Sequence, residues 1–381
     1  MAQKKRKVLI FIALLLFIMY FLLAGRSVKR EVVLEAEWIN SLLNSSNEGG
    51  FSAAADSLLP FTLGSRFGYV DSSGQIAINR IKTNEIYLSQ NMWTEYASEP
   101  SNIEIQNVFE EVIVNIDNTN IGNAGYPILL DNRIFIIGSG QNSLSEIGMY
   151  GNVLWTYEFG APLTCIDAAS GLLLTGSIDG LVEVFNSSGE RIFNFEPGGS
   201  QYSVILGCAI SSDGSRIGII SGVDQQRFLL LERSGVAGGT ESSEYKVVYH
   251  EFLNSDFRRP VRIMFIDEDR RIVYEQTNGL GCYNIRTRRG FFIPLDGEIA
   301  AIDESGDSGF FFVITSHPFQ EKRLIGIKLP QERWLSSSLS ARDVIFLRAS
   351  FTSDDVFLGR TGTSLVIGGG SVLISFGLEE K

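Results

Sequence analysis

The side chains best suited to nucleophilic or acid–base chemistry are few in this sequence. The 381 residues contain two histidines, His250 and His317, and three cysteines, Cys165, Cys208 and Cys282. Protein zinc sites use clustered Cys and His ligands, and neither a CxxC nor an HExxH pattern occurs here. We therefore expect no metal site and interpret both histidines as surface or hydrogen-bonded groups.

One short string is similar to the nucleophile segment of trypsin-like serine proteases. It is Gly306-Asp307-Ser308-Gly309. A serine nucleophile needs a histidine base and an orienting carboxylate in a fixed geometry. The sole upstream histidine, His250, lies in VVYHEFL, which has none of that family's surrounding sequence. Asp-Ser-Gly between two strands is also an ordinary turn, so we predict a turn here and no catalytic residue.

The elements that would position any site are revealed by an internal repeat. Residues 134–160 and 172–198 align without a gap at an offset of 38 residues. Each copy has an apolar strand ending in Gly-Ser, an alternating strand, a turn with glycine, and a strand with an aromatic residue. The matched landmarks are Gly138 with Gly176, Ser139 with Ser177, Gly151 with Gly189, and Trp155 with Phe193.

Fainter copies extend the repeat in both directions. Upstream, Gly64-Ser65 and the turn Asp71-Ser-Ser-Gly74 repeat two of the landmarks, and 364–376 repeats the two-strand pattern near the C-terminus. A period near 40 residues with about four short strands is typical of a propeller blade. We predict an all-β propeller over 60–377 with seven four-stranded blades, eight being the alternative. The terminal sequences permit the two chain ends to share one blade and so close the ring.

The repeat resembles that of quinoprotein-type (PQQ-like) propellers. The resemblance rests on Gly176-Ser177, Asp179-Gly180, Gly189 and Phe193, is good for 125–200, and elsewhere is equally WD-repeat-like. It implies the propeller fold and little about activity. The residues that would bind PQQ and calcium cannot be placed, so we expect no cofactor.

Two of the cysteines occupy equivalent repeat positions. Cys165 and Cys208 are 43 residues apart, and each lies in an expected inner strand. A disulfide between them needs Cα atoms within about 7 Å and an oxidising compartment. The sequence favours buried free thiols and leaves the disulfide open.

The N-terminus predicts a membrane anchor. Residues 8–25 form an uncharged apolar run, which as a helix would span about 27 Å, close to the thickness of a bilayer's hydrocarbon core. The run exceeds a usual signal-peptide core of about 7–15 residues and has no clear cleavage site. Arg26 stands where a lipobox would require Cys, which excludes a lipoprotein on this start site.

Charge around the anchor predicts its orientation. The basic cluster in the tail 1–7 (Lys4, Lys5, Arg6 and Lys7) outweighs the three basic residues that follow the span, so the positive-inside rule places the N-terminus in the cytoplasm. We expect a single-pass protein of the inner (cytoplasmic) membrane with its propeller facing the periplasm or exterior.

Two short segments separate the anchor from the propeller. In 28–43, Val32, Ala36, Ile39 and Leu43 lie on one helical stripe, which predicts a juxtamembrane amphipathic helix. Residues 44–59, rich in Asn, Ser and Gly at their start, are expected to be a linker.

Composition limits the function. After residue 30 the chain carries 25 basic and 44 acidic residues, a balance that phosphate backbones would repel, so we expect no nucleic-acid binding. The repeat fold, the tether and the lack of a convergent catalytic set predict a non-enzymatic scaffold that binds another envelope or membrane protein. The alternative is a PQQ-like or other small-ligand-binding enzyme that uses the propeller channel.

Overall fold

The computed structural model describes most of the chain. The described residues are 14–15, 17, 19–20, 32–43, 58–98, 100–117, 119, 125–233, 244–303, 309–329 and 344–380. One compact unit spans Ala36–Gly377, and the described residues within Met1–Glu35 and Leu378–Lys381 belong to a second unit.

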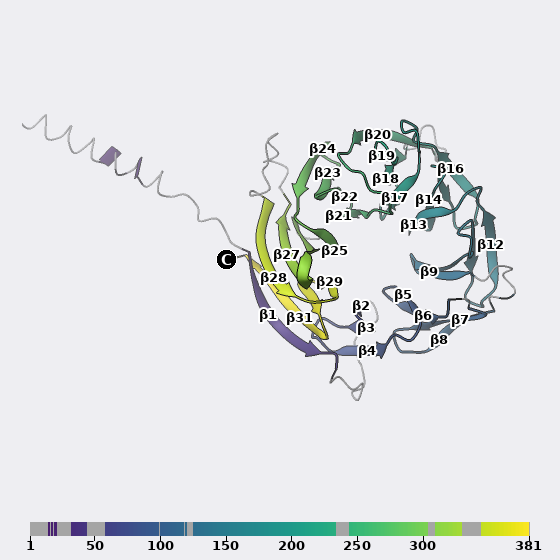
Figure 1. Ribbon diagram of the computed structural model, residues 1–381, viewed down its shortest axis with the longest axis horizontal. Helices are drawn as coiled ribbons and strands as arrows, with labels where there is room; N and C mark the ends of the chain where they lie inside the picture. Colours follow the sequence, from purple (N-terminus) through teal and green to yellow (C-terminus); the bar gives the residue numbers. More distant parts are fainter. Residues whose placement is uncertain are drawn as a thin grey trace, which may run out of the picture. The chain divides into compact units, whose positions relative to one another are not determined.

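Eight antiparallel sheets follow one another around a ring, as Figure 1 shows, and each is a blade of a β-propeller. The all-β propeller is therefore confirmed. The expectation of seven blades is wrong, and the eight-bladed alternative is correct. Numbered along the chain from β2, blades 1 to 3 consist of β2 (Leu59–Leu63), β3 (Arg66–Val70) and β4 (Ile76–Ile81); β5 (Glu85–Leu88), β6 (Met92–Tyr96), β7 (Asn102–Asn107) and β8 (Val112–Asp117); and β9 (Tyr126–Leu130), β10 (Arg133–Ile137), β11 (Ser143–Ile147) and β12 (Val153–Glu158).

The remaining blades have four strands each. Blades 4 to 6 consist of β13 (Leu163–Ala169), β14 (Leu172–Ser177), β15 (Val182–Phe185) and β16 (Arg191–Phe195); β17 (Ile205–Ile210), β18 (Arg216–Ser221), β19 (Arg227–Arg233) and β20 (Tyr245–Phe252); and β21 (Ile263–Ile266), β22 (Arg271–Gln276), β23 (Gly279–Asn284) and β24 (Arg289–Pro294). Blade 7 consists of β25 (Glu298–Ile302), β26 (Phe310–Ser316), β27 (Glu321–Lys328) and β28 (Ile345–Thr352), with the short 3₁₀ helix η4 (Pro318–Gln320) between β26 and β27. Blade 8 consists of β29 (Val356–Thr361), β30 (Ser364–Gly369), β31 (Val372–Glu380) and β1 (Val32–Ser41).

Burial within a blade follows from the stacking of neighbouring blades. The middle strands β22 and β23 are buried along their whole length, because each blade packs on both of its faces. The outer strand β12 instead alternates between exposed and half-buried residues. Runs of Val, Ile, Leu and Phe therefore mark the middle strands, and two-residue alternation marks the outer ones.

Blade 8 is closed by both ends of the chain. Its outermost strand is β1, which is hydrogen-bonded to β31. The Leu42 amide donates to the Ser371 carbonyl (2.8 Å), and the Ser375 hydroxyl donates to the Glu37 carboxylate (2.9 Å). Closure with strands from both termini leaves no open edge between the first and last blades.

The prediction of an amphipathic helix over 28–43 is wrong where the structure can test it, because residues 32–41 form β1. The apolar residues of this segment fit a helical stripe, but their burial follows the two-residue period of a strand. Trp38 and Asn40 are half-buried, and Ile39 between them is 65% exposed. Residues 28–31 lie outside the described part of the chain. Residues 32–41 form a strand because they pair with β31, and the local sequence pattern contains no signal of this distant pairing.

The three strands of blade 1 correspond to the second, third and fourth strands of the other blades. In blade 4, the turn before the outermost strand contains Gly189, where a Cβ atom would lie 2.4 Å from Trp155 on the outermost strand of blade 3. In blade 1, a Cβ atom at Gly74 would lie 2.6 Å from Trp38 on the outermost strand of blade 8. The β3–β4 turn thus takes the place of the turn before a fourth strand. Among the described residues, no strand fills the innermost position of blade 1.

A buried ion pair joins blades 7 and 8. The Arg360 guanidinium of β29 lies 2.7 Å from the Asp303 carboxylate, with both side chains almost fully buried. Arg360 also donates to the Phe310 carbonyl (2.8 Å), which completes the pairing of this charge.

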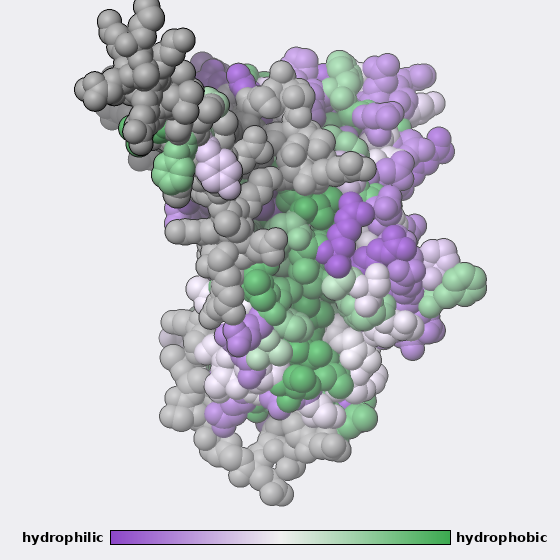
Figure 2. Space-filling model, turned by 90° about the vertical axis from the view of Figure 1, so that its left-hand side faces the viewer, coloured by the Kyte–Doolittle hydropathy of each residue, from purple (hydrophilic) through white to green (hydrophobic). Residues whose placement is uncertain are grey.

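The outer side of the ring is not uniformly polar. Figure 2 shows the side on which β1 and β28 lie in Figure 1, and there a band of apolar residues runs between more hydrophilic ones.

The predicted anchor lies almost wholly outside the described residues. Of 8–25, the structure describes only Leu14, Leu15, Phe17, Met19 and Tyr20, which are helical. Among the described residues, no helix has the length and apolar character needed to cross a bilayer. The tail 1–7 and all but the last residues of the expected linker 44–59 also lie outside the described part.

Candidate binding surface

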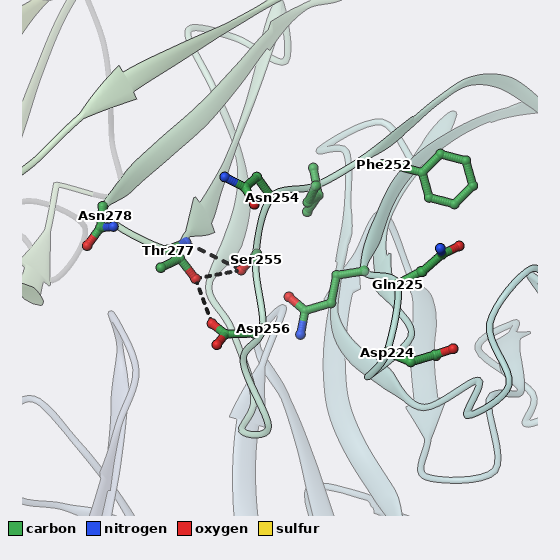
Figure 3. Close-up of a pocket in the computed structure, with 10 residues that line it drawn as sticks. Asp224, Gln225, Phe252, Asn254, Ser255, Asp256, Thr277 and Asn278 are labelled. Atoms are coloured by element: carbon green, nitrogen blue, oxygen red, sulfur yellow. Dashed lines mark hydrogen bonds between the residues drawn. The ribbon is translucent and has the colours of Figure 1, made fainter.

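The longest described link between two blades is the segment 253–262, which joins β20 of blade 5 to β21 of blade 6. It runs beside the β22–β23 turn at Thr277 and Asn278 and the β18–β19 turn at Asp224 and Gln225, as Figure 3 shows. Connections on this face of a propeller join strands whose positions the blades fix, so side chains on them are held in place by the scaffold.

Polar contacts hold this link against the neighbouring turns. The Thr277 amide donates to the Ser255 hydroxyl (3.3 Å), and the Thr277 hydroxyl donates to the Asp256 carboxylate (3.1 Å). On the other side, the Leu253 amide donates to the Gln226 carbonyl (2.8 Å). A ten-residue link with these bonds has far fewer conformations than a free loop of its length.

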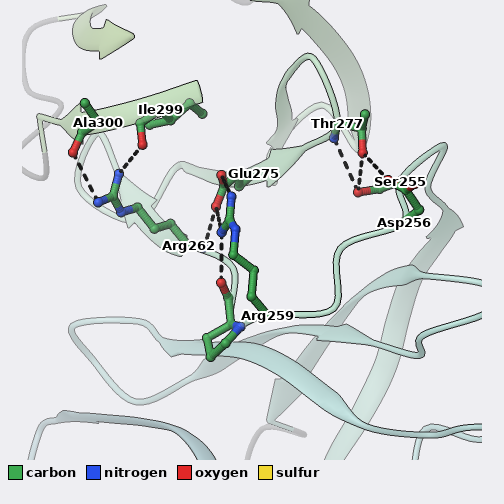
Figure 4. A network of polar contacts seen from close by, with 9 residues as sticks. Ser255, Asp256, Arg259, Arg262, Glu275, Thr277, Ile299 and Ala300 are labelled. Atoms are coloured by element: carbon green, nitrogen blue, oxygen red, sulfur yellow. Dashed lines mark hydrogen bonds and ion pairs between the residues drawn. The ribbon is translucent and has the colours of Figure 1, made fainter. Parts of the chain in front are cut away.

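An ion pair fixes the end of the link (Figure 4). The Arg259 guanidinium donates two hydrogen bonds to the Glu275 carboxylate, of 2.6 and 3.1 Å. Glu275 is 4% exposed, and the hydrogen bonds that its carboxylate accepts raise the pKa of Arg259. Arg259 also lies over the Phe257 ring, with 4.5 Å between the guanidinium carbon and the ring centroid. The half-exposed guanidinium therefore has a fixed orientation and retains solvent-facing donors.

The same network reaches blade 7. The Arg262 guanidinium donates to the carbonyls of Ile299 and Ala300, both at 3.3 Å. The Glu275 amide donates to the Arg262 carbonyl (2.9 Å). Polar contacts of the link 253–262 thus reach blades 5, 6 and 7.

Tyrosines pack between blades 5 and 6 near this link. Tyr249 and Tyr274 both donate to the Glu251 carboxylate, at 2.5 and 2.6 Å. Tyr274 stacks on Phe228 with ring centroids 4.3 Å apart, and Tyr249 stacks on Tyr283 at 4.1 Å. Burial, with the Glu251 charge adding to it, raises the pKa of Tyr274 and Tyr249 well above the usual value for tyrosine.

Three hollows adjoin the Thr277–Asn278 turn. Their volumes are about 580, 720 and 480 Å³, and both residues of the turn line all three. The first lies between blades 5 and 6, the second between blades 6 and 7, and the third between β20 of blade 5 and β24 of blade 6. We call this region the Thr277 surface; it comprises the link 253–262, the turn, and the lining of the three hollows.

Exposed aromatic rings and charges border these hollows. Phe252 and Phe292 are 58% and 46% exposed and line them. The carboxylate of Asp224 accepts a hydrogen bond from the Ser200 hydroxyl, which lowers its pKa to about 2. Aromatic rings and arginine are the groups most often responsible for binding energy at protein interfaces.

The polar groups of the three hollows are of a few kinds. The lining offers amides, hydroxyls, carboxylates and one paired arginine. His317 lines the second hollow, but its ring bonds the Thr315 hydroxyl (3.1 Å). His250, on β20, is exposed, with Phe252 as its ring neighbour (centroids 6.4 Å apart). Within the described residues, no group of three or more His, Cys, Asp or Glu side chains could hold a metal ion.

The repeat landmarks lie at matching places in blades 3 and 4. Gly138-Ser139 follows β10 and Gly176-Ser177 ends β14; Gly151 and Gly189 lie in the turns before β12 and β16, with φ of 75° and 77°; Trp155 and Phe193 lie within those strands. These residues are spread through two blades as turn and packing positions and do not converge on a site. The topology residues Lys4, Lys5, Arg6 and Lys7 lie outside the described part of the chain. Of the string 306–309, only Gly309 is described.

Sequence reasoning missed the Thr277 surface. Arg259, Glu275 and Thr277 are far enough apart in sequence that only the adjacency of β21 and β22 joins them. A usable signal was the unusual spacing between β20 and β21, where the run LNSDFRRP interrupts the strand pattern.

Comparison with known proteins agrees with this fold. A family described as "beta-propeller protein" matches residues 1–367. The chain belongs to this family. Among curated proteins, an "Uncharacterized protein" of Treponema pallidum (strain Nichols) is 26% identical over 245 residues, which cover 64% of this chain and 62% of that protein. The match thus spans less than two thirds of the relative's length.

Solved structures share the propeller architecture of this chain. BamB from Moraxella catarrhalis superposes with a TM-score of 0.53 at 9% identity, covering 91% of this chain and all of that one. The computationally designed Ika8 protein superposes with a TM-score of 0.56 at 13% identity, covering 85% of this chain and 94% of that one. At these identities the likeness concerns the fold alone.

Proposed function

We propose that this chain is a non-enzymatic, membrane-anchored scaffold of the cell envelope that binds a partner protein at the Thr277 surface. The observation that carries the proposal is the polar network across blades 5 to 7, which holds exposed aromatic rings and an oriented arginine beside three adjoining hollows. The BamB-like architecture and the PQQ-like or WD-repeat-like landmarks are compatible with protein interaction.

The physical argument rests on pre-organisation. Because Glu275 fixes Arg259 and Thr277 fixes the link through Ser255 and Asp256, a partner would not have to order these side chains on binding. The entropy cost of such ordering is about 0.5–1.5 kcal/mol for each immobilised side chain. A rigid polar surface with aromatic borders therefore favours protein recognition.

The anchor belongs to the same proposal. The apolar run 8–25 and the basic cluster before it support a single-pass segment of the inner membrane with the propeller in the periplasm or exterior. Protease added to intact spheroplasts should then digest the propeller. Digestion only after membrane rupture would contradict this location.

Site-specific photocrosslinking tests the binding role. A photoreactive residue at Asn278 of the full chain, irradiated in native cells, should give one discrete crosslinked product with a protein partner. Tyr150, which is 96% exposed in the β11–β12 turn, is the matched control position. Identical products from both positions, or none from Asn278, would contradict the proposal.

A channel ligand is the second candidate. A hollow of about 530 Å³ is lined by residues of β13, β17 and β21, the innermost strands of blades 4, 5 and 6, and this favours a small molecule. PQQ with calcium should give neither a thermal shift nor dye-linked oxidation if the scaffold function is correct. Either response would favour the enzyme.

A further inference from the structure

The three cysteines described by the structure are free thiols, and two of them line the channel hollow. Cys165 lies on β13 and Cys208 on β17, which are innermost strands of adjacent blades. Cys208 is 7% exposed and Cys165 is half-buried, and both belong to one apolar cluster between the two blades.

Two hydrogen bonds set these strands side by side. The Thr164 hydroxyl donates to the Ile205 carbonyl (2.6 Å), and the Ile210 amide donates to the Asp167 carboxylate (2.8 Å). The two strands therefore run in the same direction, and the residues between these bonds face one another. Cys165 and Cys208 lie between these bonds. They are 43 positions apart, as are Asp167 and Ile210, and Thr164 and Ile205 are 41 apart.

The direction of the Cys165 side chain agrees with this placement. A Cβ atom at Gly176 of β14 would lie 2.6 Å from the Cys165 sulfur and 2.5 Å from the Ile205 side chain. The sulfur thus lies over Gly176, on the side facing blade 5. The absence of a side chain at Gly176, one of the repeat landmarks, provides the space.

We infer that Cys165 and Cys208 form a redox-active pair that can close into a disulfide across blades 4 and 5. The oxidant is a low-mass disulfide that enters the channel hollow. The Cys165 thiolate attacks one sulfur of the oxidant, which breaks its S–S bond, releases one thiolate and leaves a mixed disulfide on Cys165. Cys208 then loses its proton and attacks the Cys165 sulfur, which releases the second thiol. One oxidant is reduced to two thiols, and two protein thiols are oxidised to one disulfide.

The order of attack follows from exposure. Cys165 is the more accessible of the two and lines the hollow. Burial raises the pKa of Cys208, which disfavours its thiolate as the first nucleophile. Cys165 is therefore the attacking thiol and Cys208 the resolving one.

Thiol counting with a Cys282→Ala variant of the full chain tests this inference. Cys282 lies on β23 in a separate apolar cluster, so its removal leaves only the pair. After treatment with oxidised glutathione and unfolding, this variant should take up no N-ethylmaleimide, and its mass should be lower by two hydrogen atoms. A phosphine reductant should restore two reactive thiols.

A second variant, Cys208→Ser, tests the order of the two steps by a different measurement. Cys208→Ser in the Cys282→Ala background should retain a stable glutathione adduct on Cys165, because the resolving thiol is gone. Oxidation of the intact pair should also raise the melting temperature, since the bond joins two strands 43 residues apart. Two alkylatable thiols after oxidation, or a persistent adduct on the intact pair, would overturn the inference. Neither outcome depends on the proposed binding function.

Discussion

The junctions between blades 3 and 4 and between blades 5 and 6 follow the same architecture with different chemistry. The first is made by residues 159–162 and an apolar cluster that includes Phe159 and Phe185. The second is made by residues 253–262, an apolar cluster that includes Phe228 and Tyr274, and the Arg259–Glu275 network. The two junctions thus differ in the polar network that the lengthened link adds to the second, and we propose that this network presents a surface for partner binding.

The largest expected loss of stability comes from a substitution at the junction between blades 3 and 4. Gly189→Ala would place a Cβ atom 2.4 Å from the Trp155 ring at a φ of 77°. We expect the free energy of unfolding to fall by about 2–4 kcal/mol, measured by urea denaturation of the full chain.

The matched control is Gly171→Ala, at a φ of 73° with no atom within 4 Å of the new Cβ. It should cost only about 1–2 kcal/mol, the strain of the backbone alone. Equal losses in the two variants would show that the contact with Trp155 contributes nothing.

The next largest effects are the losses of stability on breaking an ion pair at each junction. Glu275→Gln removes the charge that orients Arg259, and Glu183→Gln does the same for the Glu183–Arg191 pair of blade 4 (2.7 Å). The two glutamates are 4% and 4% exposed, and in each pair the arginine is half-exposed. Both changes should lower the free energy of unfolding by about 1–3 kcal/mol. Only Glu275→Gln should weaken partner binding, and an equal loss of binding in both variants would contradict the comparison.

The repeat shows how much of the fold can be predicted from sequence. Gly176-Ser177 and Gly189 recur because tight turns and close approach between blades require them, so they indicate blades directly. The blade number was underestimated because blade 1 has three described strands and its turn, at Gly74, packs on Trp38 from the far end of the chain. Trp38 precedes Gly74 by nearly the same interval as Trp155 precedes Gly189, a signal concealed by the helical stripe around it.

The Thr277 surface was less accessible to prediction. In the sequence, Glu275 is indistinguishable from other strand residues, and Arg259 is one of several charged residues in an expected turn. Their pairing depends on the path of the link 253–262, which is set by tertiary contacts and not by local periodicity. The equivalence of Cys165 and Cys208, by contrast, followed from the repeat itself.

A smaller effect concerns pH and the tyrosines beneath the surface. Tyr274 has a raised pKa when folded, so above about pH 10 the unfolded chain releases a proton that the folded chain retains. Stability should therefore be fully present below that pH and fall as pH rises. Tyr274→Phe should reduce this slope by up to about 1.4 kcal/mol per pH unit, measured by urea denaturation between pH 9 and 11. An unchanged slope would contradict the assignment.

The smallest expected effect on stability is that of Phe252→Ala, because this ring is 58% exposed. The free energy of unfolding should change by no more than about 0.5 kcal/mol. A larger loss would show that the ring supports the fold and is not simply displayed to a partner.

The most direct test of the Thr277 surface is the affinity of the photocrosslinked partner for the full chain, measured with Phe252→Ala, Arg259→Ala and the exposed control Tyr150→Ala. The account predicts that Kd rises at least about tenfold for the first two and is unchanged for the control. Unchanged affinity for Phe252→Ala and Arg259→Ala, with the fold intact, would contradict it.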